Sequence, residues 1–144
     1  REGGWARKLD YMGWGLTGRT LGVIGLGGIG RDFLSLAAPW GMRRLGHDPY
    51  VDPARVAEIG VEAVDLDTLL AESDAVVIAC QLTPETHHLL NAERLGRMKP
   101  TAFLINIARG PIVDEAALVE ALRAGRLRGA GLDVFEQEPV DPAN

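Results

Sequence analysis

The chain has 144 residues, 47% of them hydrophobic and 24% charged, with a formal net charge of −5 at pH 7. This length predicts one domain with a single core, and the acidic balance argues against nucleic acid or an anionic membrane as the main partner. The one cysteine, Cys80, excludes an internal disulfide. Because no segment has the character of a signal peptide or a membrane span, the composition indicates a cytoplasmic protein.

Residues 1–19 predict a lead-in helix or arm ahead of the first strand. They carry Trp5, Tyr11, Met12 and Trp14 among glycines and basic residues. These apolar side chains either pack onto their own domain or form a surface that another domain or a second subunit covers. The chain starts without Met and ends without a closing element, so we expect a piece of a longer polypeptide.

The segment 20–30 organises the rest of the chain. Its apolar run Leu21–Ile24 predicts a buried strand, which breaks into a G-x-G-x-x-G pattern at Gly25, Gly27 and Gly30. Such glycines allow a tight turn, close approach of the backbone to a pyrophosphate, and close packing of helix on strand. The helix-forming stretch that follows would point free N–H groups and its positive dipole end at a bound phosphate.

An acidic residue follows the second expected strand at the spacing of a dinucleotide site. Asp48 lies 18 positions after Gly30, close to the roughly 20 residues expected for the carboxylate that binds the ribose hydroxyls. A carboxylate there would repel a 2′-phosphate, which favours NAD over NADP. The alternative is that Asp48 and Pro49 form a turn that merely ends the strand.

From Leu21 onward, apolar strands alternate with helical stretches. The expected strands are 21–25, 42–47, 61–63, 75–79, 102–106 and 128–132, and the expected helices are 28–39, 53–59, 66–72, 91–97 and 114–125. Asp114 suits the start of the last helix and Gly125 its end. Repeated strand–helix units predict an α/β fold: a doubly wound parallel Rossmann-type sheet in three layers, in residues 20–144. Ligands of such sheets lie at the carboxyl ends of the strands.

Two adjacent histidines, His87 and His88, follow the third long strand. They suggest a general base or a metal site, but no cluster of Cys, Asp or Glu with ligand spacing surrounds them. The simpler interpretation, which we favour, is a pair of solvent-exposed residues at the start of a helix.

Charged residues also follow the next two strands. Arg109 comes just after an apolar strand and before Gly-Pro, where it is suited to hold a carboxylate in a bidentate manner or to pair with a surface acid. Asp133, Glu136 and Glu138 follow the last strand. They either meet a cofactor or form an acidic exit loop, and Pro139 predicts an extended conformation for Glu138.

Taken together, five motifs in order resemble the NAD-binding domain of the D-isomer-specific 2-hydroxyacid dehydrogenases. The resemblance covers nearly the whole chain from about Trp5, and the motifs are Leu21–Gly30, Asp48–Tyr50, Leu82–Thr86, Asn106–Gly110 and Leu132–Pro139. The chain departs from the pattern of many members at Gly28 and Gln81. The resemblance implies NAD as cofactor, hydride transfer between NAD(H) and a small 2-hydroxy or 2-oxo acid, and a homodimer.

The resemblance also implies a role for each matched residue. Those expected to bind the cofactor are Gly25, Gly27, Gly28, Ile29 and Gly30 at the pyrophosphate; Asp48 at the adenosine ribose; Cys80, Gln81 and Thr86 on the adenine side; Ile107, Ala108 and Arg109 at the nicotinamide half; and Asp133 at its carboxamide. The catalytic residues would be Arg109 and Glu138. Arg109 would grip the substrate, and Glu138 would raise the pKa of a catalytic histidine that follows this stretch in the family.

Two other functions share this scaffold. A non-catalytic, NAD-responsive interaction protein resembling transcriptional corepressors is one, although it would need neither Arg109 nor Glu138. Another dehydrogenase of the same superfamily, acting on formate or phosphonate, is the other. We expect activity only in a complete two-domain enzyme, and the residues do not specify which 2-hydroxy acid is used.

Overall fold

The computed structural model describes residue 13 and residues 15–140, so most of the predicted arm over residues 1–19 lies outside the described residues. Six parallel strands form one sheet in the order β3-β2-β1-β4-β5-β6. Their bounds are β1 Thr20–Ile24, β2 Arg43–His47, β3 Glu62–Ala63, β4 Ala75–Ile78, β5 Phe103–Asn106 and β6 Gly129–Leu132. This order confirms the predicted doubly wound Rossmann-type fold.

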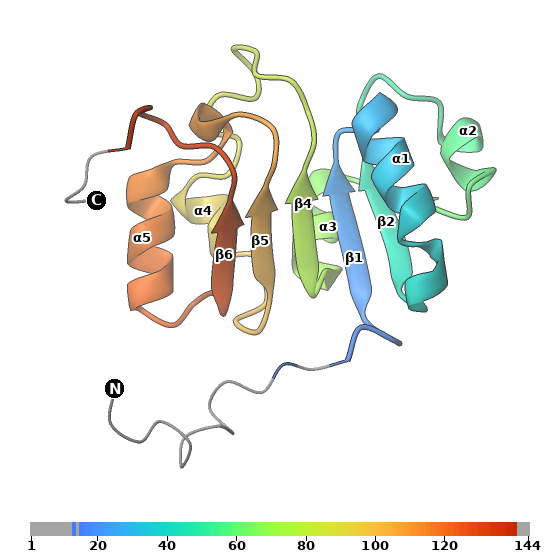
Figure 1. Ribbon diagram of the computed structural model, residues 1–144, viewed down its shortest axis with the longest axis horizontal. Coiled ribbons are helices and arrows are strands. Elements are labelled where there is room, and N and C mark those ends of the chain that lie inside the picture. Colours follow the sequence, from blue (N-terminus) through green and yellow to red (C-terminus); the bar gives the residue numbers. More distant parts are fainter. Residues whose placement is uncertain (1–12, 14, 141–144) are drawn as a thin grey trace.

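Helices connect the strands and cover both faces of the sheet, as Figure 1 shows. They are α1 Gly28–Leu36, α2 Pro53–Ala57, α3 Leu66–Glu72, α4 Ala92–Leu95 and α5 Glu115–Arg123, with 3-10 turns at Ala38–Trp40 and Gly110–Ile112. Helix α1 lies in front of the sheet in this view, and α3 and α4 lie behind it. None of the helices in the described part is long and apolar enough to cross a bilayer.

Most helices begin where the sequence predicts, because a short polar side chain caps the first turn. Asp52, Asp65, Asn91 and Asp114 each accept a hydrogen bond from a backbone N–H of their own helix. Several helices end earlier than predicted. The expected helix 28–39 ends at residue 36 and continues as a 3-10 turn that contains proline, which cannot donate the next helical hydrogen bond.

The core lies on both faces of the sheet. Along β4, Val76 and Ile78 pack into the cluster that contains α3, α4 and α5, whereas Val77 packs into the cluster beneath α1 and α2. Alternation of this kind explains why the central strands are continuous apolar runs, since both faces of each strand are buried. The sheet is therefore a rigid layer whose strand ends carry the loops.

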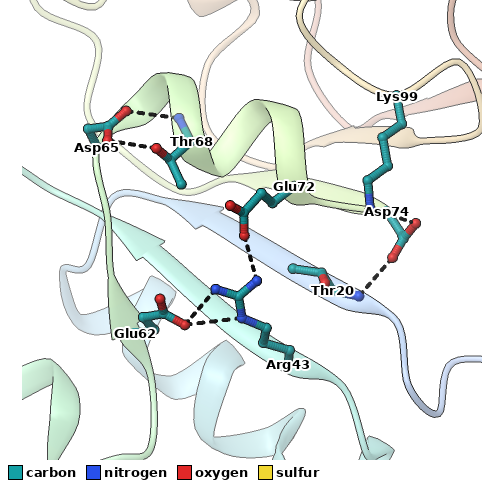
Figure 2. Close-up of polar contacts among 8 residues, drawn as sticks. All are labelled: Thr20, Arg43, Glu62, Asp65, Thr68, Glu72, Asp74 and Lys99. Carbon is teal, nitrogen blue, oxygen red and sulfur yellow. Dashed lines mark hydrogen bonds and ion pairs between the residues drawn. The ribbon is translucent and has the colours of Figure 1, made fainter.

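The rim at the amino ends of the strands is held by charged side chains (Figure 2). Arg43 on β2 lies between Glu62 and Glu72 and forms an ion pair with each. Buried Asp74 accepts hydrogen bonds from the backbone N–H of Thr20 at 2.9 Å and from Lys99 Nζ at 3.1 Å. Burial by itself would raise the pKa of Asp74, but these hydrogen bonds outweigh it and lower the pKa.

Candidate functional site

Two adjoining cavities lie at the carboxyl ends of the central strands, at the edge opposite the charged rim. The larger measures about 530 Å³ and the smaller about 390 Å³. They share the lining residues Ile29, Ala79, Cys80 and Gln81, so they form one continuous cleft. Predicted site residues that line the cleft are Gly25, Gly27, Gly28, Ile29, Asp48, Cys80, Gln81, Thr86, Ile107, Ala108 and Arg109.

The glycine turn forms one wall of the cleft. Gly25 has φ +95°, and a Cβ there would lie 2.5 Å from the backbone nitrogen of Cys80. At Gly30 a Cβ would lie 2.0 Å from the carbonyl oxygen of Gly25, so a side chain would force the turn and α1 apart. By contrast, Gly27 and Gly28 have open space around them and face the larger cavity. Close packing therefore explains why residues 25 and 30 are glycine. At Gly27 and Gly28 the missing side chain leaves the backbone accessible from the larger cavity.

The amino end of α1 opens onto the same cavity. Gly27 caps this helix without any side-chain hydrogen bond, whereas side chains cap each of the other four described α-helices. No acidic residue occupies the first turn of α1. A helix end of this kind presents N–H groups and a positive dipole end to an anion.

Asp48 forms the opposite end of the cleft, just beyond β2. Its Oδ2 accepts from the backbone N–H of Leu26 at 2.9 Å, and its Oδ1 accepts from that of Tyr50 at 3.0 Å. Each carboxylate oxygen has a second lone pair, so the group keeps acceptor capacity toward the cleft. The side chain thus also serves the turn suggested as an alternative, and one role does not exclude the other.

The loop after β4 crosses the middle of the cleft. Thr86 Oγ1 donates to the carbonyl of Gln81 at 2.7 Å and accepts from the N–H of Thr83 at 2.7 Å, which closes the loop on itself. Cys80 lies at the start of this loop and lines both cavities. Burial raises the pKa of its thiol, and the negative charge of Asp48 adds to the effect.

The loop after β5 carries Arg109, and buried Asn106 holds its shape. Asn106 Nδ2 donates to the carbonyl of Arg109 at 2.9 Å, and its Oδ1 accepts from the N–H of Ala108 at 3.0 Å. The guanidinium donates from Nη1 to the Ala108 carbonyl at 2.6 Å, and its residue is exposed at the smaller cavity. The sequence patterns predicted no separate role for Asn106. A polar residue at the end of an otherwise apolar strand is the feature that could have indicated its role in holding this loop.

The remaining predicted residues, Gly30, Asp133 and Glu138, are not among the lining residues of either cavity. The N–H of Asp133 donates to the carbonyl of Asn106 at 3.0 Å, which keeps Asp133 beside the loop of Arg109. Glu138 is exposed, and its Oε1 accepts from the N–H of Phe135 at 2.9 Å. The carboxylate therefore bends back onto its own loop.

The histidine pair differs from its predicted setting. His87 and His88 lie in a turn rather than at a helix start, and only His87 is exposed. His88 has φ +48° and its Nε2 lies 2.5 Å from Glu136 Oε1. This partner is 48 residues away in the chain, which is why the local pattern did not reveal it. No group of three or more His, Cys, Asp and Glu side chains in the described part of the chain is arranged to hold a metal ion.

Comparison with known proteins agrees with this geometry. The family model for the NAD-binding domain of D-isomer-specific 2-hydroxyacid dehydrogenases matches residues 1–144. A glyoxylate reductase of Thermococcus onnurineus is 48% identical, over 96% of this chain and 43% of its own length. A D-3-phosphoglycerate dehydrogenase of Synechocystis is 46% identical, over 97% of this chain and 25% of its own. The chain thus spans less than half the length of these relatives.

A solved structure gives the same result. The D-lactate dehydrogenase of Aquifex aeolicus, crystallised with NAD and lactic acid, superposes with a TM-score of 0.84 at 40% identity, over 92% of this chain and 41% of that one. The chain therefore belongs to the D-isomer-specific 2-hydroxyacid dehydrogenase family, as the NAD-binding domain of that family.

Proposed function

We propose that this chain is the cofactor half of an oxidoreductase that transfers hydride between NAD(H) and a small D-2-hydroxy acid or 2-oxo acid. One observation carries the proposal: a single cleft runs from Asp48, past the glycine turn, to Arg109. An acidic residue at one end and a guanidinium at the other suit a dinucleotide whose reactive end meets an anionic substrate.

The residues of the cleft fit the cofactor. Gly27 and Gly28 leave open space beside the uncapped end of α1, where N–H groups would bind the pyrophosphate. Asp48 would accept hydrogen bonds from the adenosine ribose, and Cys80, Gln81 and Thr86 would border the adenine side. Among the described residues, neither Lys nor Arg lines the larger cavity, and the Asp48 carboxylate would repel a 2′-phosphate, which supports NAD over NADP.

The opposite end of the cleft would receive the nicotinamide half. Ile107 and Ala108 line the smaller cavity together with Arg109, and Asp133 lies next to this loop. Asp133 would accept from the nicotinamide carboxamide. NADH, when bound, supplies the hydride.

Reduction of a 2-oxo acid places negative charge on the carbonyl oxygen. Arg109 would hold the substrate carboxylate and stabilise that developing charge, because its cationic guanidinium donates hydrogen bonds in a fixed fork. Glu138 would pair with a catalytic histidine of the complete enzyme, raise its pKa and keep it ready to donate a proton to the oxygen. In this structure Oε1 of Glu138 accepts from the N–H of Phe135, and Oε2 would accept from the histidine.

The substrate class is proposed from the relatives. The two sequence relatives and the solved neighbour are a glyoxylate reductase, a D-3-phosphoglycerate dehydrogenase and a D-lactate dehydrogenase. Glyoxylate is a 2-oxo acid, and 3-phosphoglycerate and lactate are 2-hydroxy acids, so the three names share this class of acid and differ in its side chain. We extend this class of acid to this protein. We also propose a homodimeric assembly, which the family resemblance supports, and a cytoplasmic location, which the single cysteine supports.

The test uses the full-length protein. NADH binding is measured by fluorescence titration, and NADH oxidation is followed with glyoxylate, hydroxypyruvate and pyruvate. Binding together with turnover of at least one 2-oxo acid supports the proposal. Binding without turnover of any of them would favour the interaction protein or the dehydrogenase acting on formate or phosphonate, and assays with these two substrates separate the two. No binding at millimolar NADH would end the proposal. Sedimentation of the same sample tests the dimer.

A further inference from the structure

A group of side chains outside the cleft ties together three of its loops. His88, in the loop after β4, contacts Glu136 Oε1 in the exit loop after β6. Glu136 Oε2 accepts from the backbone N–H of Glu115 at 3.1 Å, at the first turn of α5. In return, Glu115 Oε1 accepts from the N–H of Glu136 at 2.7 Å. Both oxygens and the backbone amide of Glu136 are therefore held.

Backbone contacts join the same loops. The N–H of His88 donates to the carbonyl of Pro111 at 2.8 Å. A Cβ at Gly110 would lie 1.9 Å from the carbonyl of Phe135 and 2.4 Å from the nitrogen of Glu136, so the chain after β6 runs directly against Gly110. The loops after β4, β5 and β6 thus pack as one unit.

This unit carries both proposed catalytic residues. Arg109 immediately precedes Gly110, and Glu138 lies two residues after Glu136 with its carboxylate on the N–H of Phe135. A shift of Glu136 would therefore move Glu138 directly and would move Arg109 through the contact at Gly110.

The geometry of His88 indicates a role beyond packing. Its φ of +48° is uncommon for a residue other than glycine and persists only where the surroundings fix it. The His87 ring stacks on it, with ring centroids 4.1 Å apart. The two paired side chains are 38% and 30% exposed, and polar contacts between side chains this exposed contribute little to stability. The backbone of His88 is strained, and its contact with Glu136 contributes little free energy. This combination suggests that the contact serves to fix the position of the loop that carries Glu136.

We propose that His88 and Glu136 are positioning residues: their contact, anchored on Glu115, fixes the loop of Glu138 against the loop of Arg109 in the geometry that the substrate needs. This inference rests on the proposed function for its catalytic consequence. Asp48 and the glycine turn lie outside the unit, whereas Thr86, Ile107 and Ala108, which we place at the cofactor, lie on its loops. We therefore expect the contact to affect turnover of the 2-oxo acid more than the affinity for NADH.

The test compares variants of the full-length enzyme. His88→Asn removes the contact because its side chain is too short, while asparagine tolerates the left-handed backbone. His88→Gln restores a nitrogen donor at similar reach, and Glu120→Gln on the exposed side of α5 is the control. We expect His88→Asn to lower kcat/KM for the 2-oxo acid about 10- to 100-fold, because small displacements of catalytic groups slow a reaction by such factors. The NADH Kd should change less than twofold. His88→Gln should recover part of the loss, and the control should match wild type.

Amide hydrogen exchange provides a readout independent of turnover. His88→Asn should lose protection at residues 110–115 and 133–138 and keep it in β1 and α1. Unchanged protection, or a kcat/KM within twofold of an active wild type, would overturn the inference. A parallel loss of NADH affinity and thermal stability would also overturn it, because that pattern indicates a general structural role. If wild type lacks activity, the proposed function fails, and the exchange data alone decide on the contact.

Discussion

The carboxylate of Asp48 accepts a hydrogen bond from the backbone N–H of Leu26, with 2.9 Å between oxygen and nitrogen. These residues are 22 positions apart, at the ends of neighbouring strands, and the bond ties the acidic end of the cleft to the glycine turn. One side chain thus shapes the turn and faces the proposed ribose site. A substitution at Asp48 must be designed to separate the two effects.

Asp48→Asn keeps one acceptor oxygen, for Leu26, but it loses the acceptor for the N–H of Tyr50 and removes the charge. We expect a small fall in Tm, an NADH Kd raised about 10- to 100-fold by loss of charge-assisted hydrogen bonds worth about 1.5–3 kcal/mol, and weaker discrimination against NADPH. Asp48→Ala should lower the Tm further. Fluorescence titration and thermal melts measure both effects, with Asp52→Asn at the cap of α2 as control. Equal NADH affinity in wild type and Asp48→Ala would show the ribose assignment to be wrong.

Arg109→Ala should separate substrate chemistry from cofactor binding. Loss of the guanidinium removes a fixed donor to the developing oxyanion, so we expect kcat/KM for the 2-oxo acid to fall about 10²- to 10³-fold. The NADH Kd should change less than threefold. Arg109→Lys should recover little, because an ammonium lacks the bidentate fork. Steady-state kinetics of the full-length enzyme test this prediction, with Arg123→Ala on the exposed side of α5 as the control. A change in NADH Kd larger than the change in kcat/KM for the 2-oxo acid would contradict the prediction.

The glycine turn offers a matched pair of substitutions. A Cβ at Gly30 would lie 2.0 Å from the Gly25 carbonyl, whereas one at Gly28 meets nothing within 4 Å. Gly30→Ala should therefore cost about 1–3 kcal/mol of unfolding free energy by overpacking. Gly28→Ala should cost none, because alanine is the better helix former. Denaturant unfolding distinguishes them, and an equal loss in both variants would mean that backbone freedom, not packing, governs the turn.

Cys80 reports on occupancy of the cleft. Its thiol has a raised pKa and lines both cavities, and the thiolate is the reactive form. Iodoacetamide at pH 7 should therefore alkylate it more slowly than a free thiol such as glutathione. The rate should rise as the pH is increased beyond about 8.5, the usual pKa of a thiol. Saturating NADH should slow the reaction further. Mass spectrometry measures the single alkylated residue, and Cys80→Ser is the control without a thiol. An alkylation rate that NADH does not change would mean that the cofactor does not bind in this cleft.

Asp74 should make the fold sensitive to acid. A lowered pKa in the folded state means that the carboxylate stabilises the protein above its usual pKa near 4, and that this stability is lost as the pH falls through the lowered value. Asp74→Asn should reduce stability at pH 7 by about 1–3 kcal/mol and flatten its dependence on pH below 4. Urea unfolding from pH 2 to 7 measures this, with Glu120→Gln as control. Parallel pH profiles for wild type and Asp74→Asn would contradict the assignment.

The sequence by itself determined the fold and the sheet edge that carries the site. Continuous apolar runs such as Ala75–Ile78 indicated strands buried on both faces, and the alternation with helices required parallel strands. Parallel strands bring all their carboxyl ends to one edge. For that reason the sequence predicts that the glycine turn, Asp48 and Arg109 lie at the same edge of the sheet, where the structure has the cleft.

Only the tertiary structure decided how the strand-end loops contact one another. The bond from Leu26 to Asp48, the clamp of Asn106 on the Arg109 loop and the contact of His88 with Glu136 do not follow from any local pattern. Hydrophobic periodicity and capping residues describe short stretches of chain, whereas these contacts depend on strand order and loop conformation. Residues up to 48 positions apart meet only after the sheet has formed.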